Sequence, residues 1–391
     1  MTRQRLVHAT GLSRAVVTQR VAQLLDYGLL AEGELGPSTG GRAPRLLRLR
    51  ADAGHLLVAD LGATSIDVAV ADLSGAVVGH LEETADIADG PDVILDRVEA
   101  MFVDCRRGVE APGQLWGIGI GVPGPVEFES GRPVAPPIMP GWDRHPVRDR
   151  FASYGVPVWV DNDVNVMALG EARAGVAAGQ DNVVFVKVGT GIGAGIIVHG
   201  KLLRGADGCA GDVGHMQVNE TREVVCRCGN VNCLEALAGG AAIGRDGEAA
   251  ASAGRSPFLA HVLEQKGALD VRDIGRAASH GDAVSVELLT NSGRLIGQML
   301  AGVVNLLNPS MIVLGGGVVR TGDLILATVR EGVYRRSLPL ATRDLAVKRS
   351  TLDGIGGAVG AAAMVLDELF APHRLGEWLE HGAPVGRAAE G

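Results

Sequence analysis

The chain has 391 residues, 47% of them apolar and 3% aromatic, with a mean hydropathy of +0.20 and a net charge of −9. This length suffices for two or three domains, while no apolar run is long enough to span a bilayer and no secretory signal follows Met1. An odd count of five cysteines without a leader argues against a disulfide framework and predicts a cytoplasmic protein.

Charge is distributed unevenly along the chain. Residues 1–50 carry eight arginines, no lysine and three acidic residues, a net charge of +5, and the remaining residues carry −14. A basic head on an acidic body favours a separate nucleic-acid module. The alternative is a basic end that is merely solvated, and charge by itself does not decide between the two.

The basic head has the pattern of a winged helix-turn-helix. Apolar residues at helical spacing predict a helix from Arg14 to about Tyr27, which Ser13 can cap and Gly28 can end. The full predicted order is a helix at 2–9, a turn at 10–13, the helix from Arg14, and strands at 29–35 and 44–50 around the loop 36–42. Two helices joined by a glycine-containing turn are typical of a helix-turn-helix.

The second helix of such a module enters the major groove, where residues near its N-terminus meet base edges. The candidates for this contact are Arg14, Ala15, Val16 and Gln19. On the wing, Arg42 and Arg45 would meet phosphates or a minor groove, whose negative potential suits arginine. Because any two short amphipathic helices can mimic this motif, the prediction of operator DNA as a partner depends on charge and wing together.

The acidic body begins with an apolar strand at 56–62 that leads into Asp60-Leu-Gly62-Ala-Thr64. Strands at 65–71, 76–81 and 116–122 and a helix at 91–106 are predicted to follow it. A further strand at 156–160 delivers Asp161-Asn162-Asp163 to the start of a helix. Either aspartate could simply cap that helix; we prefer the capping interpretation for Asp161 and a site for Asp163.

Two glycine-rich segments follow predicted strands. The strand 183–188 leads into Gly189-Thr190-Gly191-Ile-Gly193-Ala-Gly195, where small residues let backbone N–H groups approach an anion. A turn and strand over 308–314 lead into Gly315-Gly316-Gly317, for which a generic strand-to-helix turn is an equally good interpretation.

The later part of the chain is mostly helical in pattern. We predict an exposed loop at 245–257 and a loose tail from Ala371. The remaining predicted elements are helices at 270–280, 282–307, 323–335 and 354–369 and a strand at 346–349.

One histidine and three cysteines lie within twenty residues: His215, Cys226, Cys228 and Cys233. Zinc is commonly held by four such ligands in a tetrahedron, and four protein ligands make the site structural. The alternative is that these are ordinary buried cysteines. Since three of the five cysteines of the chain fall here, we predict Zn²⁺.

His215 followed by Cys-x-Cys-Gly-x-x-x-Cys-x-Glu235 resembles the zinc signature of the ROK family, which groups bacterial repressors and sugar kinases. The loop at 36–44 resembles the wing of its repressors. The resemblance implies an actin-like (ribonuclease H-like) two-lobed α/β ATPase fold with an N-terminal winged helix-turn-helix. The implied domains are the DNA-binding head 1–50, a first lobe 55–165, a second lobe 166–370 whose last helix, 354–369, returns to the first, and the tail 371–391.

The resemblance implies that the winged domain begins with another helix, for which no residues precede Met1 in this sequence; we expect either that the true start lies upstream or that this copy is shortened. Without that helix the small core of the head lacks one wall. The expectation is that residues 1–50 alone bind DNA weakly.

The resemblance to the kinases also implies site residues. Asp163 is the implied general base that takes a proton from a sugar hydroxyl, as phosphoryl transfer requires. Substrate is implied to meet Gly124, Asn162, Asp163, Asp212, His215 and Glu235, and nucleotide to meet Asp60, Gly62, Thr64, Gly189, Thr190, Gly191, Gly193, Gly315, Gly316 and Gly317. The kinases have glutamate at the position of Asp212, so the shorter side chain puts sugar affinity or sugar choice in doubt.

Two functions are compatible with these features. The first is a sugar-responsive transcriptional regulator, a repressor by expectation, that binds operator DNA through its head and a sugar or phosphosugar in its cleft. The alternative is an ATP-dependent hexose kinase that uses ATP and Mg²⁺. A homodimer or a dimer of dimers is expected from the family and from the twofold symmetry of operators.

Overall fold

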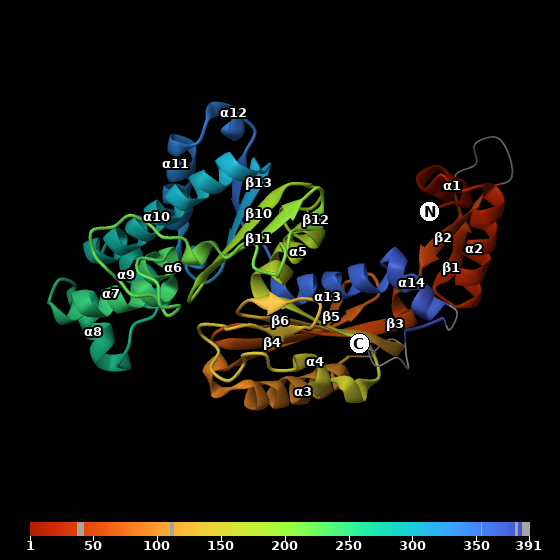
Figure 1. Ribbon diagram of the computed structural model, residues 1–391, viewed down its shortest axis with the longest axis horizontal. Coiled ribbons are helices and arrows are strands. Elements are labelled where there is room, and N and C mark those ends of the chain that lie inside the picture. The colour runs from red at the N-terminus through yellow and green to blue at the C-terminus, as the bar shows by residue number, and fades with distance from the viewer. Residues whose placement is uncertain (37–42, 110–112, 353, 380–381, 385–391) are drawn as a thin grey trace.

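The computed structural model describes residues 1–36, 43–109, 113–352, 354–379 and 382–384, so Arg42 of the predicted wing lies outside the described residues. Two five-stranded sheets form two lobes, and a unit of two helices and a hairpin lies beside the first lobe (Figure 1). The predicted two-lobed α/β fold is thereby confirmed. In the described part of the chain, no helix is long and apolar enough to cross a membrane.

The first sheet has the strand order β5-β4-β3-β6-β9. Its strands are β3 (Gly54–Leu61), β4 (Ser65–Asp72), β5 (Val77–Thr84), β6 (Gln114–Val122) and β9 (Val158–Asn162). In β3, Leu57 and Ala59 face α3 (Pro91–Arg107), while Leu56 and Val58 face α13 (Gly356–Leu369). Because helices cover both faces, the strand reads as a continuous apolar run.

The second sheet repeats this arrangement in the order β12-β11-β10-β13-β14. Its strands are β10 (Val183–Val188), β11 (Ile192–Val198), β12 (Lys201–Leu202), β13 (Met311–Gly315) and β14 (Ala346–Arg349). Val184 and Val186 face the core under α10 (Ala283–Leu307) and α11 (Asp323–Arg336), and Val183 and Phe185 face α5 (Asp163–Ala174). Two related halves therefore place equivalent strand ends on either side of one cleft.

Helices α5 and α13 pack against each other between the lobes (Figure 1). A Cβ atom added to Gly360 of α13 would lie 1.5 Å from the carbonyl oxygen of Val166 in α5, so no larger residue fits there. The small residues of α13 thus allow this helix to cross α5 at short range. This crossing fixes the N-terminus of α5, where Asp163 lies, relative to the first sheet.

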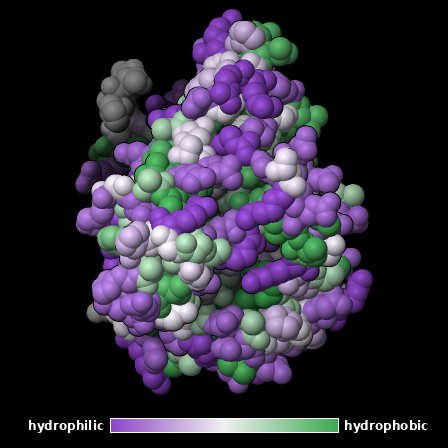
Figure 2. Space-filling view, turned by 90° about the vertical axis from the view of Figure 1, so that its left-hand side faces the viewer, coloured by the Kyte–Doolittle hydropathy of each residue, from purple (hydrophilic) through white to green (hydrophobic). Residues whose placement is uncertain are grey.

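The predicted loop at 245–257 is wrong. Helix α7 (Gly240–Ser252) runs through most of it, and Ser256 caps α8 (Pro257–Lys266) by accepting a hydrogen bond from the Leu259 N–H. The glycines misled the prediction because they pack closely: a Cβ on Gly247 would lie 2.4 Å from Ile274 of α9 (Val271–Ser279). Figure 2, which views the end of the molecule that α7 and α8 occupy, shows hydrophobic side chains dispersed among hydrophilic ones.

The head contains α1 (Arg3–Thr10), α2 (Arg14–Asp26) and an antiparallel hairpin of β1 (Leu30–Leu35) and β2 (Arg45–Leu49). The Ser13 side chain caps α2, as predicted, by accepting from the Val16 N–H at 3.3 Å. Only Val17, Val21 and Leu47 of its own apolar cluster are buried, and α1 buries no residue. The core of the head is therefore small.

The tail from Ala371 is not loose over its first residues. It forms α14 (Pro372–Trp378), and the indole of Trp378, 5% exposed, packs edge-on against Trp116 with ring centroids 5.3 Å apart. Leu24 and Tyr27 of the head pack on the same apolar cluster, which Figure 1 shows as α14 lying beside the hairpin. Leu375 of the same helix and Leu379 just after it also pack on this cluster.

The remaining described elements are short. They are β7 (Val126–Glu127) and β8 (Arg132–Pro133), α4 (Val147–Arg150), α6 (Leu234–Ala238) and α12 (Pro339–Thr342). Val126 and Glu127 of β7 line a second pocket that also reaches Asp212 and His215, and Cys233, the last cysteine of the predicted metal site, immediately precedes α6.

Candidate functional site

A cleft of about 670 Å³ lies between the lobes. It is lined by all of the predicted substrate and nucleotide residues, although they come from segments more than 250 residues apart: Asp60, Gly62, Thr64, Gly124, Asn162, Asp163, Gly189, Thr190, Gly191, Gly193, Asp212, His215, Glu235, Gly315, Gly316 and Gly317. The fold therefore brings the predicted site together. The sequence-based roles of these residues remain predictions.

The helix cap at the cleft is Asn162, and the capping interpretation of Asp161 is wrong. Asn162 Oδ1 accepts from the Val164 N–H at 2.9 Å, and its Nδ2 donates to the Gly124 carbonyl at 2.9 Å. Asp161 is 1% exposed and instead pairs with Arg204 Nε at 2.7 Å. The strand extends two residues further than predicted, which turns the side chain of Asp161 inward and leaves Asn162 at the helix start.

Asp163 is held by a lysine that the sequence analysis did not select. Lys187 Nζ donates to Asp163 Oδ2 at 2.5 Å, and the Val164 N–H donates to Asp163 Oδ1 at 2.8 Å. A usable signal was present, because Lys187 follows Val183 and Phe185 at period two on the buried face of β10. Burial disfavours the Lys187 ammonium, but the carboxylates of Asp163 and Asp60 outweigh it and hold the pKa of Lys187 above its usual value.

Asp60 lies at the end of β3 with its carboxylate beside two glycines of other elements. A Cβ on Gly357 would lie 1.9 Å from Asp60 Oδ2, and one on Gly121 would lie 2.8 Å from Asp60 Oδ1. Burial raises the pKa of Asp60 to about 7, with the Lys187 ammonium opposing this shift and the charge of Asp163 adding to it. Near neutral pH, a large fraction of Asp60 is therefore protonated.

Asp60→Asn is expected to stabilise the protein more at pH 8 than at pH 5. A carboxyl with a pKa of 3.8 when unfolded and about 7 when folded binds more protons in the folded state. Its contribution to stability therefore falls as the pH rises from about 4 to about 7. We expect the gain from the substitution to differ between the two pH values by on the order of 2 kcal/mol. Urea unfolding at both values measures it, and an equal gain at both would contradict the raised pKa.

The two glycine-rich segments meet at one edge of the second sheet, since Lys187 and Gly315 are paired in the parallel strands β10 and β13. The first segment is a tight hairpin turn of Gly189–Gly191, while Gly193 and Gly195 belong to β11. Within the turn, the Gly189 N–H donates to the Gly191 carbonyl. Glu235 Oε2 accepts from the Ile192 N–H at 3.0 Å, so this carboxylate holds the turn in addition to facing the cleft.

His215 divides its two ring nitrogens between the cysteine cluster and the cleft. Nδ1 lies 3.7 Å from Cys226 Sγ, while Nε2 lies 4.0 Å from Asp212 Oδ1. The Asp212 side chain is 46% exposed. This geometry is compatible with the predicted double task of His215.

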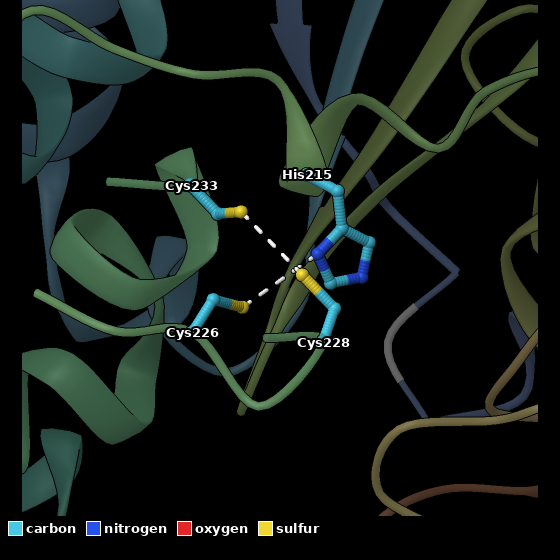
Figure 3. A group of neighbouring side chains, drawn as sticks. All are labelled: His215, Cys226, Cys228 and Cys233. Carbon is cyan, nitrogen blue, oxygen red and sulfur yellow. Dashed lines mark hydrogen bonds between the residues drawn. The ribbon is translucent and has the colours of Figure 1, made fainter. Parts of the chain in front are cut away.

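Four side chains form a cluster that can hold a metal ion. One ligand atom each of His215, Cys226, Cys228 and Cys233 lies within 4.8 Å of the others, and Figure 3 shows them converging on a common point. Gly229 follows the Cys226–Cys228 pair with a φ of +90°, which closes the turn. Cys233 lies at the N-cap of α6. Three sulfurs and one imidazole nitrogen are the donor set of a structural zinc site.

The thiols of this cluster differ in acidity. Burial raises the pKa of Cys233 to about 12, while a hydrogen bond from the Asn230 backbone lowers the pKa of Cys228 to about 7. A cation is the partner that would allow all three to ionise together, since metal binding displaces thiol protons.

The predicted DNA-contacting residues that the structure describes lie on the surface of the head. Arg14, Ala15, Val16 and Gln19 are exposed on α2, opposite the buried Val17 and Val21. Arg45 is exposed on β2, with its Nε 3.6 Å from Glu32. The surface that these residues form carries no apolar contact to the lobes.

Comparison with known proteins covers both the head and the lobes. The xylose repressor of Caldicellulosiruptor bescii is 31% identical over 378 residues, which cover 95% of this chain and 92% of the repressor. A solved ROK family transcriptional regulator, a homologue of the E. coli MLC protein, matches with a TM-score of 0.82 at 28% identity and covers 97% of this chain and 95% of its own.

A ROK glucokinase from Streptomyces griseus, solved with glucose and AMPPNP, matches with a TM-score of 0.71 at 30% identity; it covers 80% of this chain and 99% of its own. The model of the ROK family matches residues 57–368, from the first strand of the first lobe to the end of α13. By this match and by its full-length relatives, the chain belongs to the ROK family.

Proposed function

We propose that this protein is a transcriptional regulator, a repressor by expectation, that binds operator DNA through residues 1–50 and a sugar or phosphosugar in its cleft. The sugar would meet Asn162, His215 and Glu235 near the metal cluster, which would hold Zn²⁺ as a structural ion. A regulator of this kind acts in the cytoplasm, where its operator lies. Because operators are twofold symmetric, the active form would be a homodimer or a dimer of dimers.

The observation that carries this proposal is the part of the chain that each relative covers. The head makes up 50 of 391 residues, and the xylose repressor leaves only 5% of the chain uncovered. Most of the head therefore has a counterpart in that repressor. The glucokinase leaves a fifth of the chain uncovered while using nearly all of its own length. A head that a regulator shares and a kinase lacks supports DNA binding.

The alternative is an ATP-dependent hexose kinase with Asp163 as base. The glycine turns at Gly189–Gly191 and Gly315–Gly317 favour it, as does the glucokinase match at the lobes. The contacts of Asp163 weigh against it, because both of its carboxylate oxygens already accept hydrogen bonds, one from an ammonium ion. The regulator therefore explains more of the chain.

Arg14→Ala is expected to weaken operator binding by about 1–3 kcal/mol, since Arg14 opens the exposed face of α2. Fluorescence anisotropy with the promoter DNA upstream of the gene measures it, with and without candidate pentoses and hexoses. Arg107→Ala removes the same charge from an exposed side chain of α3 and is the matched control. Equal affinities of both variants and the wild type would refute the assignment of α2 to DNA.

Sugar-dependent binding tests the second half of the proposal. A sugar that binds the cleft should change operator affinity, and by linkage operator DNA should change sugar affinity by the same factor. A coupled ADP-release assay with the same sugars tests the kinase. Turnover that Asp163→Asn abolishes, together with sugar-independent DNA binding, would reverse the assignment.

A further inference from the structure

The ion pair of Lys187 and Asp163 lies where the two lobes meet. Asp163 comes from the N-terminus of α5, and its side chain is 5% exposed; Lys187 comes from β10, and its side chain is 22% exposed. The ammonium also interacts with Asp60 and Asp67 of the first sheet. A single positive charge therefore lies among three carboxylates that line the cleft.

A kinase of this fold would need Mg²⁺ near these carboxylates, so the fit of that ion can be examined. Mg²⁺ is held by one or two carboxylates together with water and phosphate oxygens. Both oxygens of Asp163 already have a partner, since Oδ2 accepts from Lys187 and Oδ1 from the Val164 N–H, so an ion at Oδ2 would have to share that oxygen with the ammonium. Asp60 Oδ1 is buried and, among the described residues, has no hydrogen-bond partner, so it is a further oxygen to which an ion could bind.

The Lys187 ammonium already supplies the positive charge that this group of carboxylates requires. A dication brought to Asp60 would meet that ammonium within the same group of side chains, and like charges repel at short range. The buried carboxylate of Asp60 can be neutralised by a proton instead of a metal ion, in keeping with its raised pKa. The residues present therefore do not fit a magnesium ion shared between Asp60 and Asp163.

We infer that Lys187 is a built-in cation that takes the place of a divalent metal between Asp163 and Asp60, so that the cleft binds its ligand without a divalent cation and without phosphoryl transfer. The inference rests on the juxtaposition of Lys187 Nζ with Asp163 Oδ2. It deepens the proposed function, because it makes the cleft a sensor that returns its sugar unchanged. The ammonium also occupies Asp163 Oδ2, one of the two oxygens that a kinase would turn toward a sugar hydroxyl.

Manganese binding tests this inference in the zinc-loaded, full-length protein without sugar or DNA. Electron paramagnetic resonance counts free Mn²⁺, which serves as the probe for a magnesium site. Lys187→Met keeps the length of the side chain and removes its charge, and we expect it to bind one Mn²⁺ per chain at least about tenfold more tightly than the wild type. Lys187→Arg keeps the charge and should behave like the wild type.

Two Asp163 variants complete the experiment. In the Lys187→Met background, Asp163→Asn should abolish the new Mn²⁺ site, while in the wild-type background it should leave Mn²⁺ binding unchanged. The inference is overturned if Asp163→Asn alone weakens Mn²⁺ binding, or if folded Lys187→Met gains no site. The wild-type background keeps the test decisive even if Lys187→Met does not fold. Since the assay uses neither operator nor sugar, its failure is distinct from failure of the regulator assignment.

Discussion

Replacing Cys226 and Cys233 together by serine is expected to remove one zinc ion per chain and to abolish the sugar response. Serine is a poor ligand for zinc where thiolate is the natural donor, and the folding of such loops derives from metal binding, by on the order of 10 kcal/mol in isolated zinc fingers. Both cysteines are buried, with exposures of 4% and 1%, so the loop they close packs through them. Zinc content by atomic absorption measures the loss.

The effect should reach the cleft through two short connections. His215 would lose the ion that orients its Nδ1, and Glu235, two residues beyond Cys233, would lose the support of its helix start. Glu235 holds the Ile192 N–H at the glycine turn, so the turn is expected to loosen as well. Sugar binding by calorimetry should become undetectable in the double variant.

Cys209→Ser is the matched control for these serine substitutions. Cys209 is exposed and lies outside the cluster, so its replacement should change neither zinc content nor thermal stability. A double cluster variant that keeps its sugar response would show that the metal does not shape the cleft. In that case the proposed placement of the sugar beside His215 would be wrong.

Trp378→Ala is expected to destabilise the protein by about 3–5 kcal/mol, the usual cost of removing a buried indole. Trp378 packs against Trp116 and Phe370 and donates from Nε1 to the Leu369 carbonyl at 2.9 Å. Urea unfolding measures the loss. Trp378→Phe keeps most of the packing and removes only the hydrogen bond, so it should cost about 1 kcal/mol.

Trp378→Ala should also abolish the effect of sugar binding in the cleft on DNA binding by the head. Helix α13 begins at the cleft beside Asp60, and α14 follows it to the apolar cluster on which Leu24 and Tyr27 of the head rest. With Trp378 removed, the head should still bind operator DNA, but sugar should no longer change its affinity. Anisotropy titrations with and without sugar measure this coupling, and an unchanged sugar effect would exclude α14 as the connection.

Several features of this protein were predictable because their causes are local in sequence. Ser13 caps α2 through a residue three positions later in the chain. The strands β3 and β10 are likewise recognisable from the apolar residues of each strand itself. The metal cluster was predictable for the same reason, because three of its ligands lie within eight residues and a glycine closes their turn. Residue type and spacing carry the chemistry in such cases.

Other features could not be predicted because they depend on what lies opposite. Residues 245–257 were predicted to be a loop, yet α7 runs through most of them, and its Gly247 allows the close approach of Ile274 from α9. Asn162 caps the helix, while Asp161 forms an ion pair with Arg204, which lies 43 residues away in the chain. Trp378 packs against Trp116, which lies 262 residues earlier in the chain, so the sequence near Trp378 does not reveal this contact.

The sequence by itself determined the family resemblance, the four candidate metal ligands and which polar residues line the cleft, since each depends on short spacings and strand ends. Only the tertiary structure showed the contact of Asp163 with an ammonium ion, because its partner Lys187 lies on β10, 24 residues away in the chain. A carboxylate looks the same in a sequence whether it faces a substrate or an ammonium ion. The packing of α5 against the second sheet brings Asp163 to the ammonium ion. Such packing between distant segments cannot be predicted from the residues of either segment alone.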